Sequence, residues 1–352
     1  MAAVEALVRK TVGADEPGLA LALVQDGRLL FRAGRGVADI RSKRPIDTGT
    51  NFRLASLTKQ FTAKAIMLLV REGYLAYETH LTDIFPDFPE YGKEITIRHL
   101  LTHTSGLPDY ENLIPEANPG IPVEDQQIND YQVLELLKGE KQGKFRPGTN
   151  WDYSNSGYVV LGLIAEKVSG LPFGIFLCER IFKPLGMKET VLYEKGISEV
   201  ENRAFGHSLK DGKWVIRDQS RTSATRGDGC IYSSVDDLIL WDNAWKEGTL
   251  LNREEMALAL TPVEVPGKRP VDPYGQPAAY GFGWFLNPWK GYQRAWHYGE
   301  TAGFRTAIHR FHETGLTVIV LCNREDIDAS GLALKLADIF LTGRASGQGA
   351  SY

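Results

Sequence analysis

Apolar residues recur along this chain with two different spacings. Near both ends, short runs of alternating or continuous apolar residues predict strands, whereas between residues 56 and 182 the spacing of three to four predicts helices. The predicted strands cover residues 19–24, 29–31, 37–40, 280–285, 294–297, 304–311 and 316–321. Asp26-Gly27 is a hairpin signal between the first two, and the last is apolar enough for a central strand.

Helices account for most of the remaining pattern. They are predicted over residues 2–12, 56–72, 95–102, 131–137, 159–168, 173–182, 234–245, 252–260 and 332–341, with a hairpin at 205–216. Proline-rich stretches at 108–130 and 262–279 predict loops that border a site, and a Gly- and Ser-rich tail from residue 343 predicts disorder.

Strands at both ends and helices between them predict an α/β fold of the α+β type. The sheet is predicted to be antiparallel, because tight turns join the C-terminal strands. The terminal helices are expected to flank it. A mostly helical domain, residues 77–200, is expected as an insertion into an α/β domain made of residues 1–76 and 201–352. A site at the interface of the two domains would follow from this arrangement.

Composition excludes several classes of function. The 352 residues carry a net charge of -4 and no long basic stretch, which argues against a nucleic-acid partner. No apolar run approaches the roughly 18 residues of a membrane span, and the N-terminus lacks a secretory apolar region. The chain as given is therefore expected in the cytoplasm, and a periplasmic or secreted location stays open if a leader was removed.

Cysteine and histidine spacing argues against a bound metal or other cofactor. Cys178, Cys230 and Cys322 are far apart, form no C-x-x-C pair and are expected as small core residues. No H-E-x-x-H or clustered His/Asp set occurs either. We therefore expect neither metal nor cofactor.

Ser56-Leu57-Thr58-Lys59 carries candidate chemistry at the start of a predicted helix. Residues three apart on a helix share a face, so the serine hydroxyl and the lysine amine would point into the same space. A serine there becomes a nucleophile if the lysine, or a base beside it, accepts its proton. Alone, the motif is better explained by a capping serine and a solvated lysine, because so short a pattern also arises by chance.

Three further stretches contain residues suited to catalysis. They are Tyr153-Ser154-Asn155 at a loop-to-helix junction, His297-Tyr298-Gly299 at the end of a strand, and the segment from His103 to Leu107. Each alone has a structural explanation. Asn155 would cap a helix, Gly299 would allow a turn and His103 would make structural hydrogen bonds.

In this order the motifs resemble those of the serine β-lactamase and penicillin-binding-protein superfamily. S-x-x-K is followed about a hundred residues later by Y-x-N, and then by a basic residue, x and Gly on a strand near the C-terminus. Because its second motif contains a tyrosine, the chain is similar to class C β-lactamases and their esterase and D-aminopeptidase relatives. Residues 52–63, 97–107, 147–162 and 181–187 also resemble the family, and the resemblance covers roughly residues 18–340.

The resemblance implies a β-lactamase/transpeptidase-like fold and a set of roles. Ser56 would be the acylated nucleophile, Lys59 would hold or relay its proton, and Tyr153 would act as general base and then general acid. For Tyr153 to ionise near neutral pH, the Lys59 ammonium would have to lower its pKa. The backbone N–H groups of Ser56 and Glu300 would form the oxyanion hole. Asn155 would contact the substrate acyl group and Lys59, and His297, Tyr298 and Gly299 would also bind substrate.

The third motif departs from the β-lactamase pattern, and this changes the expected substrate. His297 replaces lysine, Tyr298 replaces a hydroxyl residue, and the acidic Glu300 follows Gly299, which would repel a carboxylate or attract an amine. Little β-lactam hydrolysis is expected. The first choice is a carboxylesterase acting on short-chain esters through an acyl-enzyme at Ser56.

Two alternatives remain open. One is a peptidase or amidase of the D-aminopeptidase or penicillin-binding type, or a weak class C-like β-lactamase. The other is a non-catalytic ligand-binding relative. In every case a small molecule, an ester or amide for the enzymes, is the expected partner. Tyr110, Trp289 and Phe304 either line an apolar pocket or simply pack, and the sequence does not indicate an oligomeric state.

Overall fold

The computed structural model describes residues 1–345, and the side chains of residues 1–341. Residues 343–345 of the predicted disordered tail belong instead to the last helix, Ala329–Ala345. The remaining residues of that tail, 346–352, lie outside the described residues. Within them, seven strands form an antiparallel sheet in the order β2-β1-β12-β11-β10-β9-β8. Their bounds are Leu19–Gln25 (β1), Arg28–Arg35 (β2), Ala279–Tyr280 (β8), Phe285–Leu286 (β9), Arg294–Thr301 (β10), Phe304–Phe311 (β11) and Leu316–Cys322 (β12).

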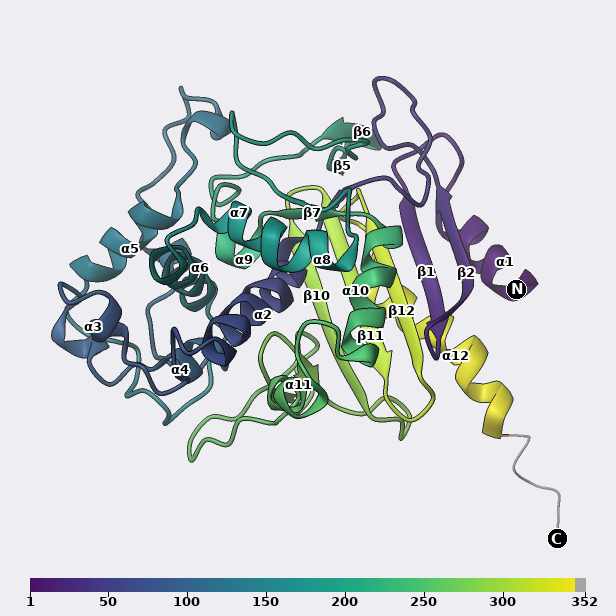
Figure 1. The fold of residues 1–352 in the computed structure, drawn as a ribbon. Helices are drawn as coiled ribbons and strands as arrows, with labels where there is room; N and C mark the ends of the chain where they lie inside the picture. The colour runs from purple at the N-terminus through teal and green to yellow at the C-terminus, as the bar shows by residue number, and fades with distance from the viewer. Residues whose placement is uncertain (346–352) are drawn as a thin grey trace, which may run out of the picture.

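The central strands β1 and β12 are buried on both faces, and their successive side chains point alternately into two cores. In β1, Leu19, Leu21 and Leu23 join a core with the terminal helices α1 (Ala2–Thr11) and α12 (Ala329–Ala345). Ala20 and Ala22 face the other core, to which the central helix α2 (Thr58–Arg71) contributes. The terminal helices therefore cover one face, and α2 lies on the other side with α10 (Val235–Glu247) (Figure 1).

Smaller sheets and short helices complete the described chain. The strands β3 (Phe52–Arg53), β7 (Ile231–Ser233) and β4 (Val191–Leu192) form one sheet, and β5 (His207–Lys210) pairs with β6 (Lys213–Ile216). The other helices are α3 (Leu81–Ile84), α4 (Ile97–Leu101), α5 (Asp130–Gly139), α6 (Asn155–Ser169), α7 (Phe173–Leu177), α8 (Lys183–Leu185), α9 (Arg226–Gly229) and α11 (Arg253–Ala259). Every residue of α2 from Thr58 to Leu69 is buried, so this helix is the centre of the molecule.

The α+β fold class is confirmed, and three details of the elements were wrong. Residues 37–40 form no strand, and Val37 makes only isolated bridges to Pro17 and Pro45. The run 280–285 is split between β8 and β9 by a turn at Gly283, where a side chain would lie 3.1 Å from the Gln60 backbone of α2. The helix 173–182 changes to a π-helical turn at Cys178–Phe182.

The large sheet takes its strands from residues 19–35 and 279–322, whereas α3 to α8 lie between residues 81 and 185. The division into two domains, with boundaries at 76 and 200, stays a prediction. Among the described residues, Cys178, Cys230 and Cys322 are free, and the last two are buried in the core.

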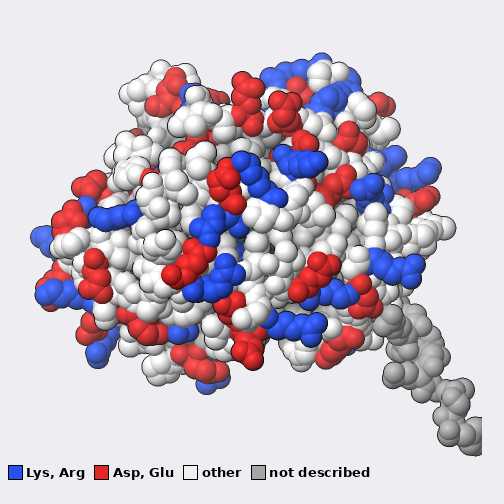
Figure 2. Space-filling model, in the orientation of Figure 1, with Lys and Arg blue, Asp and Glu red and all other residues white. Residues whose placement is uncertain are grey.

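The surface carries charges of both signs. On the face shown in Figure 2, acidic and basic side chains are interspersed over the whole outline. In the described part of the chain, no single helix has the length and apolar character to cross a membrane; α6 together with residues 173–185 has them only as a pair bent by 80°. The same residues contain no group of three His, Cys, Asp or Glu side chains placed to hold a metal ion.

Candidate active site

Ser56 lies in a tight turn at the start of the buried helix α2. The turn is the 3-10 helix η1 (Ala55–Leu57), which follows β3. Ala55 has a φ of 49°, a left-handed conformation that is uncommon for a residue other than glycine. Ser56 is half-buried, so its hydroxyl is accessible, and Lys59 Nζ lies 3.0 Å from Ser56 Oγ. The predicted pairing of hydroxyl and amine is therefore present in the structure.

Lys59 is fully buried and held by two further acceptors. Its Nζ donates to Asn155 Oδ1 at 2.8 Å and to the backbone carbonyl of Asp228 at 3.1 Å. Burial lowers the pKa of Lys59 to about 8, against the opposing effect of the carboxylates of Asp228, Glu111 and Asp109. A lysine in this state exchanges a proton near neutral pH and is placed to accept one from Ser56.

Tyr153 lies beside this pair at the N-terminus of α6. Ser154 caps that helix, since its Oγ accepts from Gly157 N, and the Lys59 ammonium is 5.0 Å from the centre of the Tyr153 ring. The buried Tyr153 hydroxyl has no hydrogen-bond partner of good geometry among the described residues. Burial raises the pKa of Tyr153, and the Ser56 side chain lowers it by less. The expectation that Lys59 lowers this pKa is not met, because desolvation raises it and the carboxylates of Asp228, Glu111 and Asp109 raise it further.

The ring of His103 packs against the ring of Tyr153. Its Nδ1 accepts the backbone N–H of Ser154 at 3.1 Å, so the proton belongs on Nε2, and its ring lies 4.4 Å from the Tyr153 ring. Burial holds the pKa of His103 well below its usual value, so the ring is neutral. The structural role that the sequence suggested for His103 agrees with this placement.

His297 is buried beside the site, and both of its ring nitrogens are engaged. Nε2 accepts from the Tyr280 hydroxyl at 3.0 Å, and Nδ1 donates to the carbonyl of Tyr298 at 2.7 Å. Burial, with the nearby Lys59 charge, lowers the pKa of His297 to about 3. At neutral pH this histidine carries no charge, and its polar atoms are turned to protein groups.

Gly299 allows β10 to pass directly against the turn that carries Ser56. A Cβ at this position would lie 2.2 Å from the carbonyl oxygen of Leu54 and 2.4 Å from Thr306 Oγ1. The same carbonyl accepts a hydrogen bond from Thr306 Oγ1 at 2.8 Å, which fastens the turn to β11. The backbone around Gly299 and Glu300 therefore lies next to Ser56, as an oxyanion hole requires.

The side chains of Tyr298 and Glu300 line a cavity of about 560 Å³ beside β10, into which Tyr274 of the loop 262–279 also projects. Glu300 pairs with Arg305, the residue opposite it on β11, with 3.4 Å between Oε1 and Nε, and its side chain is 59% exposed. Ser56, Lys59 and Tyr153 do not line this cavity.

Asp109, Tyr110, Glu111 and Asp228 also lie at the site, although the sequence motifs did not indicate them as polar site residues. Asn155 Nδ2 donates to Glu111 Oε1 at 3.0 Å, and Asp109 lies close enough to help raise the pKa of Glu111, which partial burial raises most. The Tyr110 hydroxyl contacts Asp228 Oδ2 at 3.2 Å. Burial raises the pKa of the Asp228 carboxyl to about 6. The acidic residues flanking Tyr110 in the predicted site-bordering loop were the available signal, whereas Asp228 gave none.

The three aromatic residues considered for an apolar pocket all pack in the protein. Tyr110 and Phe304 are buried in the main core. Trp289 packs with the terminal helices on the other face of the sheet and donates from Nε1 to Asp338 at 2.9 Å. For Tyr110 and Phe304 the packing alternative is the correct one, whereas the partly buried Trp289 also lines a cavity of about 560 Å³ with Pro277 and Leu334.

Comparison with known proteins identifies the family. The Beta-lactamase family model matches residues 4–339, which is almost the whole chain. The chain belongs to the Beta-lactamase family. It is thus a member of the serine β-lactamase and penicillin-binding-protein superfamily of serine hydrolases, which confirms the resemblance seen in the sequence motifs.

Individual relatives in this family are penicillin-binding proteins, D-aminopeptidases and amidases. A penicillin-binding protein of Bacillus subtilis (strain 168) is 34% identical over 91% of this chain and 71% of its own length. A D-aminopeptidase of Cereibacter sphaeroides is 29% identical over 88% of this chain, which spans only 57% of that relative. The D-amino acid amidase of Ochrobactrum anthropi SV3, solved with L-phenylalanine amide, superposes with a TM-score of 0.79 at 26% identity, covering 99% of both chains.

Proposed function

We propose that this family member is a serine hydrolase that cleaves amides or short peptides of amino acids with a free amino group, through an acyl-enzyme on Ser56. Ser56 Oγ attacks the carbonyl carbon and gives its proton to Lys59. With a pKa of about 8, Lys59 is a better proton acceptor in the resting protein than the neutral Tyr153 hydroxyl. The neutral Tyr153 hydroxyl then passes a proton to the departing amine and takes one back from the Lys59 ammonium, so that both groups return to their starting protonation states. Water releases the acid in a second step by the same groups.

The observation that carries the substrate class is the hydrogen bond from Asn155 to Glu111. Asn155 is the residue expected to contact the acyl group of a substrate, and its amide nitrogen lies 3.0 Å from the Glu111 carboxylate. In an amino-acid amide, the α-ammonium nitrogen is two bonds from the acyl carbon. It would therefore reach Glu111, where Asp109 and Asp228 add negative charge.

The same charges make a substrate carboxylate a poor fit. His297, which stands where β-lactamases have lysine, is neutral and engaged with Tyr280 and Tyr298. Support for D- rather than L-amino acids comes from the names of the D-aminopeptidase and D-amino acid amidase relatives.

Hydrolysis of short-chain esters is the second candidate, and it was the first choice from sequence. The neutral His297 favours it, since esters offer no carboxylate to be bound. Esters also have better leaving groups than amides, so the same acyl-enzyme chemistry applies to them. A β-lactamase activity is disfavoured by the lack of a cation at His297.

A substrate panel tests the proposal. Phenylalanine amide in D and L form, its N-acetyl derivative, p-nitrophenyl acetate and nitrocefin would be compared, with Ser56→Ala as the control. We expect kcat/KM for the free-amine amide to exceed that for the N-acetyl amide at least about 10-fold, the effect of one charge-assisted contact. Equal rates for the two amides, with faster turnover of the acetate, would instead favour the esterase.

A further inference from the structure

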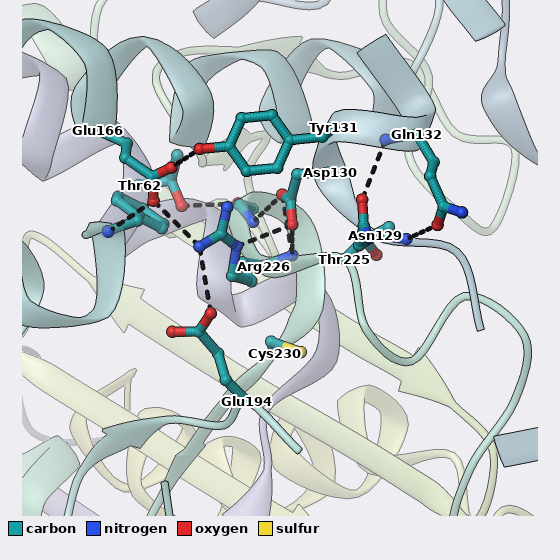
Figure 3. Close-up of polar contacts among 12 residues, drawn as sticks. Thr62, Asn129, Asp130, Tyr131, Gln132, Glu166, Glu194, Thr225, Arg226 and Cys230 are labelled. Atoms are coloured by element: carbon teal, nitrogen blue, oxygen red, sulfur yellow. Dashed lines mark hydrogen bonds and ion pairs between the residues drawn. The ribbon is translucent and has the colours of Figure 1, made fainter. Parts of the chain in front are cut away.

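One buried arginine joins four segments of the chain behind the candidate active site. Arg226, the first residue of α9, donates from Nε to Asp130 of α5 at 2.9 Å. Its Nη1 donates to Glu166 of α6 at 3.0 Å and to Glu194, which follows β4, at 3.2 Å. Figure 3 shows the guanidinium lying between these three carboxylates.

Asp130 holds the backbone of α9 as well as the arginine side chain. Its two carboxylate oxygens accept the backbone N–H of Arg226 at 3.1 and 3.2 Å. The Asp130 side chain is 1% exposed, so this carboxylate has no access to water as an alternative partner. The position and direction of the first turn of α9 are therefore fixed by this pair.

The carbonyl groups of that turn hold two side chains of α2. The Asp228 carbonyl accepts from Lys59 Nζ at 3.1 Å, and the Gly227 carbonyl accepts from Thr62 Oγ1 at 2.6 Å. Gly227 also presses against α6, where a Cβ would lie 2.1 Å from the Tyr158 carbonyl oxygen. Besides Ser56 Oγ and the Asp228 carbonyl, Lys59 Nζ donates to Asn155, the first residue of α6.

Apart from Ser56 Oγ itself, both acceptors of the lysine therefore belong to the two helices that Arg226 connects. We propose that Arg226 and Asp130 are positioning residues for Lys59: they hold α9 against α6 so that the Asp228 carbonyl and Asn155 Oδ1 fix Nζ beside Ser56. This rests on the catalytic role proposed above for Ser56 and Lys59. An arginine suits the task because its planar fork bonds several carboxylates in fixed directions, which a lysine ammonium cannot do.

A buried ion cluster is not needed for stability alone, since well-packed apolar residues often serve as well. Here three carboxylates meet one guanidinium, and Tyr131 gives a further hydrogen bond to Glu166. Such a cluster fixes the relative positions of the segments that it joins, which apolar packing does not do.

The test uses Arg226→Lys, which keeps the charge and removes the fork. We expect kcat with p-nitrophenyl acetate, and the rate at which a fluorophosphonate labels Ser56, to fall about 10-fold while KM changes less than about twofold. The pH midpoint of labelling should also move down by about half a unit, because loosened carbonyl acceptors stabilise the Lys59 ammonium less.

The other groups facing Lys59 do not change in this variant. They are Asp109 and Glu111 from the 108–130 loop, Asp228 from α9, Tyr153 and Tyr158 at and within α6, His103 after α4 and His297 on β10. A shift in the pH midpoint of Arg226→Lys therefore reports the placement of the lysine and not a change in net charge around it.

Arg324→Lys is the matched control. Arg324 is similarly buried and pairs with Glu16 and Asp326, but it lies just after β12 and donates to the Pro17 carbonyl before β1, and none of these partners belongs to α9 or α6. This control should lose stability without a change in pH midpoint. Glu194→Gln, which removes only the outermost carboxylate, is the second variant in case Arg226→Lys does not fold, and it should reduce the labelling rate about twofold to threefold with the same direction of shift.

Wild-type labelling rate and midpoint in Arg226→Lys, or in Glu194→Gln if the lysine variant does not fold, would overturn the proposal. So would a slower rate with an unmoved midpoint, because a purely structural arginine predicts that pattern. Wild-type protein that is never labelled at Ser56 would refute the proposed function itself, and would be recognised before any variant is compared.

Discussion

The side-chain amide of Asn155 joins Lys59 to Glu111. Its Oδ1 accepts from Lys59 Nζ at 2.8 Å, and its Nδ2 donates to Glu111 Oε1 at 3.0 Å. In the proposed mechanism, one residue thus orients the group that activates Ser56 and also lies against the exposed Glu111 carboxylate, which we propose binds the substrate ammonium.

Replacing Glu111 with glutamine should separate the two candidate substrates. The amide side chain can keep the contact to Asn155 but cannot attract an ammonium group. KM for a free-amine amino-acid amide should rise about 10-fold, the loss of one charge-assisted hydrogen bond, whereas kcat/KM for p-nitrophenyl acetate should change less than about twofold. Steady-state kinetics on both substrates measure this.

Glu116→Gln is the control for that experiment. Glu116 is an exposed glutamate of the same loop, so its replacement changes the net charge equally. Both substrates should be turned over as by the wild type. An equal loss for amide and ester in Glu111→Gln would contradict ammonium binding and indicate that Glu111 only supports Asn155.

The pH dependence of acylation should follow Lys59. Burial lowers its pKa to about 8, and the lysine accepts the Ser56 proton only when neutral. The rate of Ser56 labelling should therefore rise with pH, reach half its maximum near pH 8 and level off above. Lys59→Met should lower the rate by about 10³-fold or more and abolish this transition. A rate that falls between pH 7 and 9 would show that the charged lysine is the active form.

Gly299→Ala should inactivate the protein. The new Cβ would lie 2.2 Å from the Leu54 carbonyl oxygen and would push β10 away from the turn that carries Ser56. We expect labelling of Ser56 to fall at least about 100-fold, as when an oxyanion-hole donor is lost, together with a lower melting temperature. Gly139→Ala, where a Cβ meets nothing within 4 Å, should retain full activity. Wild-type labelling in Gly299→Ala would contradict the proposed oxyanion strand.

Lys64, on another face of α2, should make stability depend on pH. Its ammonium lies 3.9 Å from the centre of the Trp245 ring, and burial lowers its pKa to about 7. In the unfolded chain the pKa is about 10.4, so between pH 7 and 10 the unfolded state binds more protons and the Lys64 contribution to the free energy of unfolding rises with pH.

Lys64→Met keeps the apolar stem and removes the buried charge. The free energy of unfolding at pH 7 should increase by about 1–2 kcal/mol after the loss of the cation–π contact is included. The gain should shrink towards pH 10. Urea unfolding at pH 7 and pH 9.5 measures both effects, and a variant less stable than the wild type at pH 7 would contradict the argument.

The sequence alone located most of the elements and the three motifs. Hydrophobic spacing located most helices and strands, since periods of about two and 3.6 residues are local properties of the chain. It failed for residues 280–285, where Gly283 breaks a strand beside α2, so close that a Cβ at this position would lie 3.1 Å from the Gln60 backbone. A contact with a helix more than 200 residues away leaves no local pattern.

For the site, S-x-x-K spacing alone placed Ser56 and Lys59 within hydrogen-bond distance, because one helical turn fixes their separation. Only the tertiary structure decided the charge around them. It buried Lys59 among the carboxylates of Asp228, Glu111 and Asp109, and turned both nitrogens of His297 towards protein groups. A pKa depends on burial and on neighbours distant in sequence, so residue order determined which groups meet, and packing determined which of them carry charge.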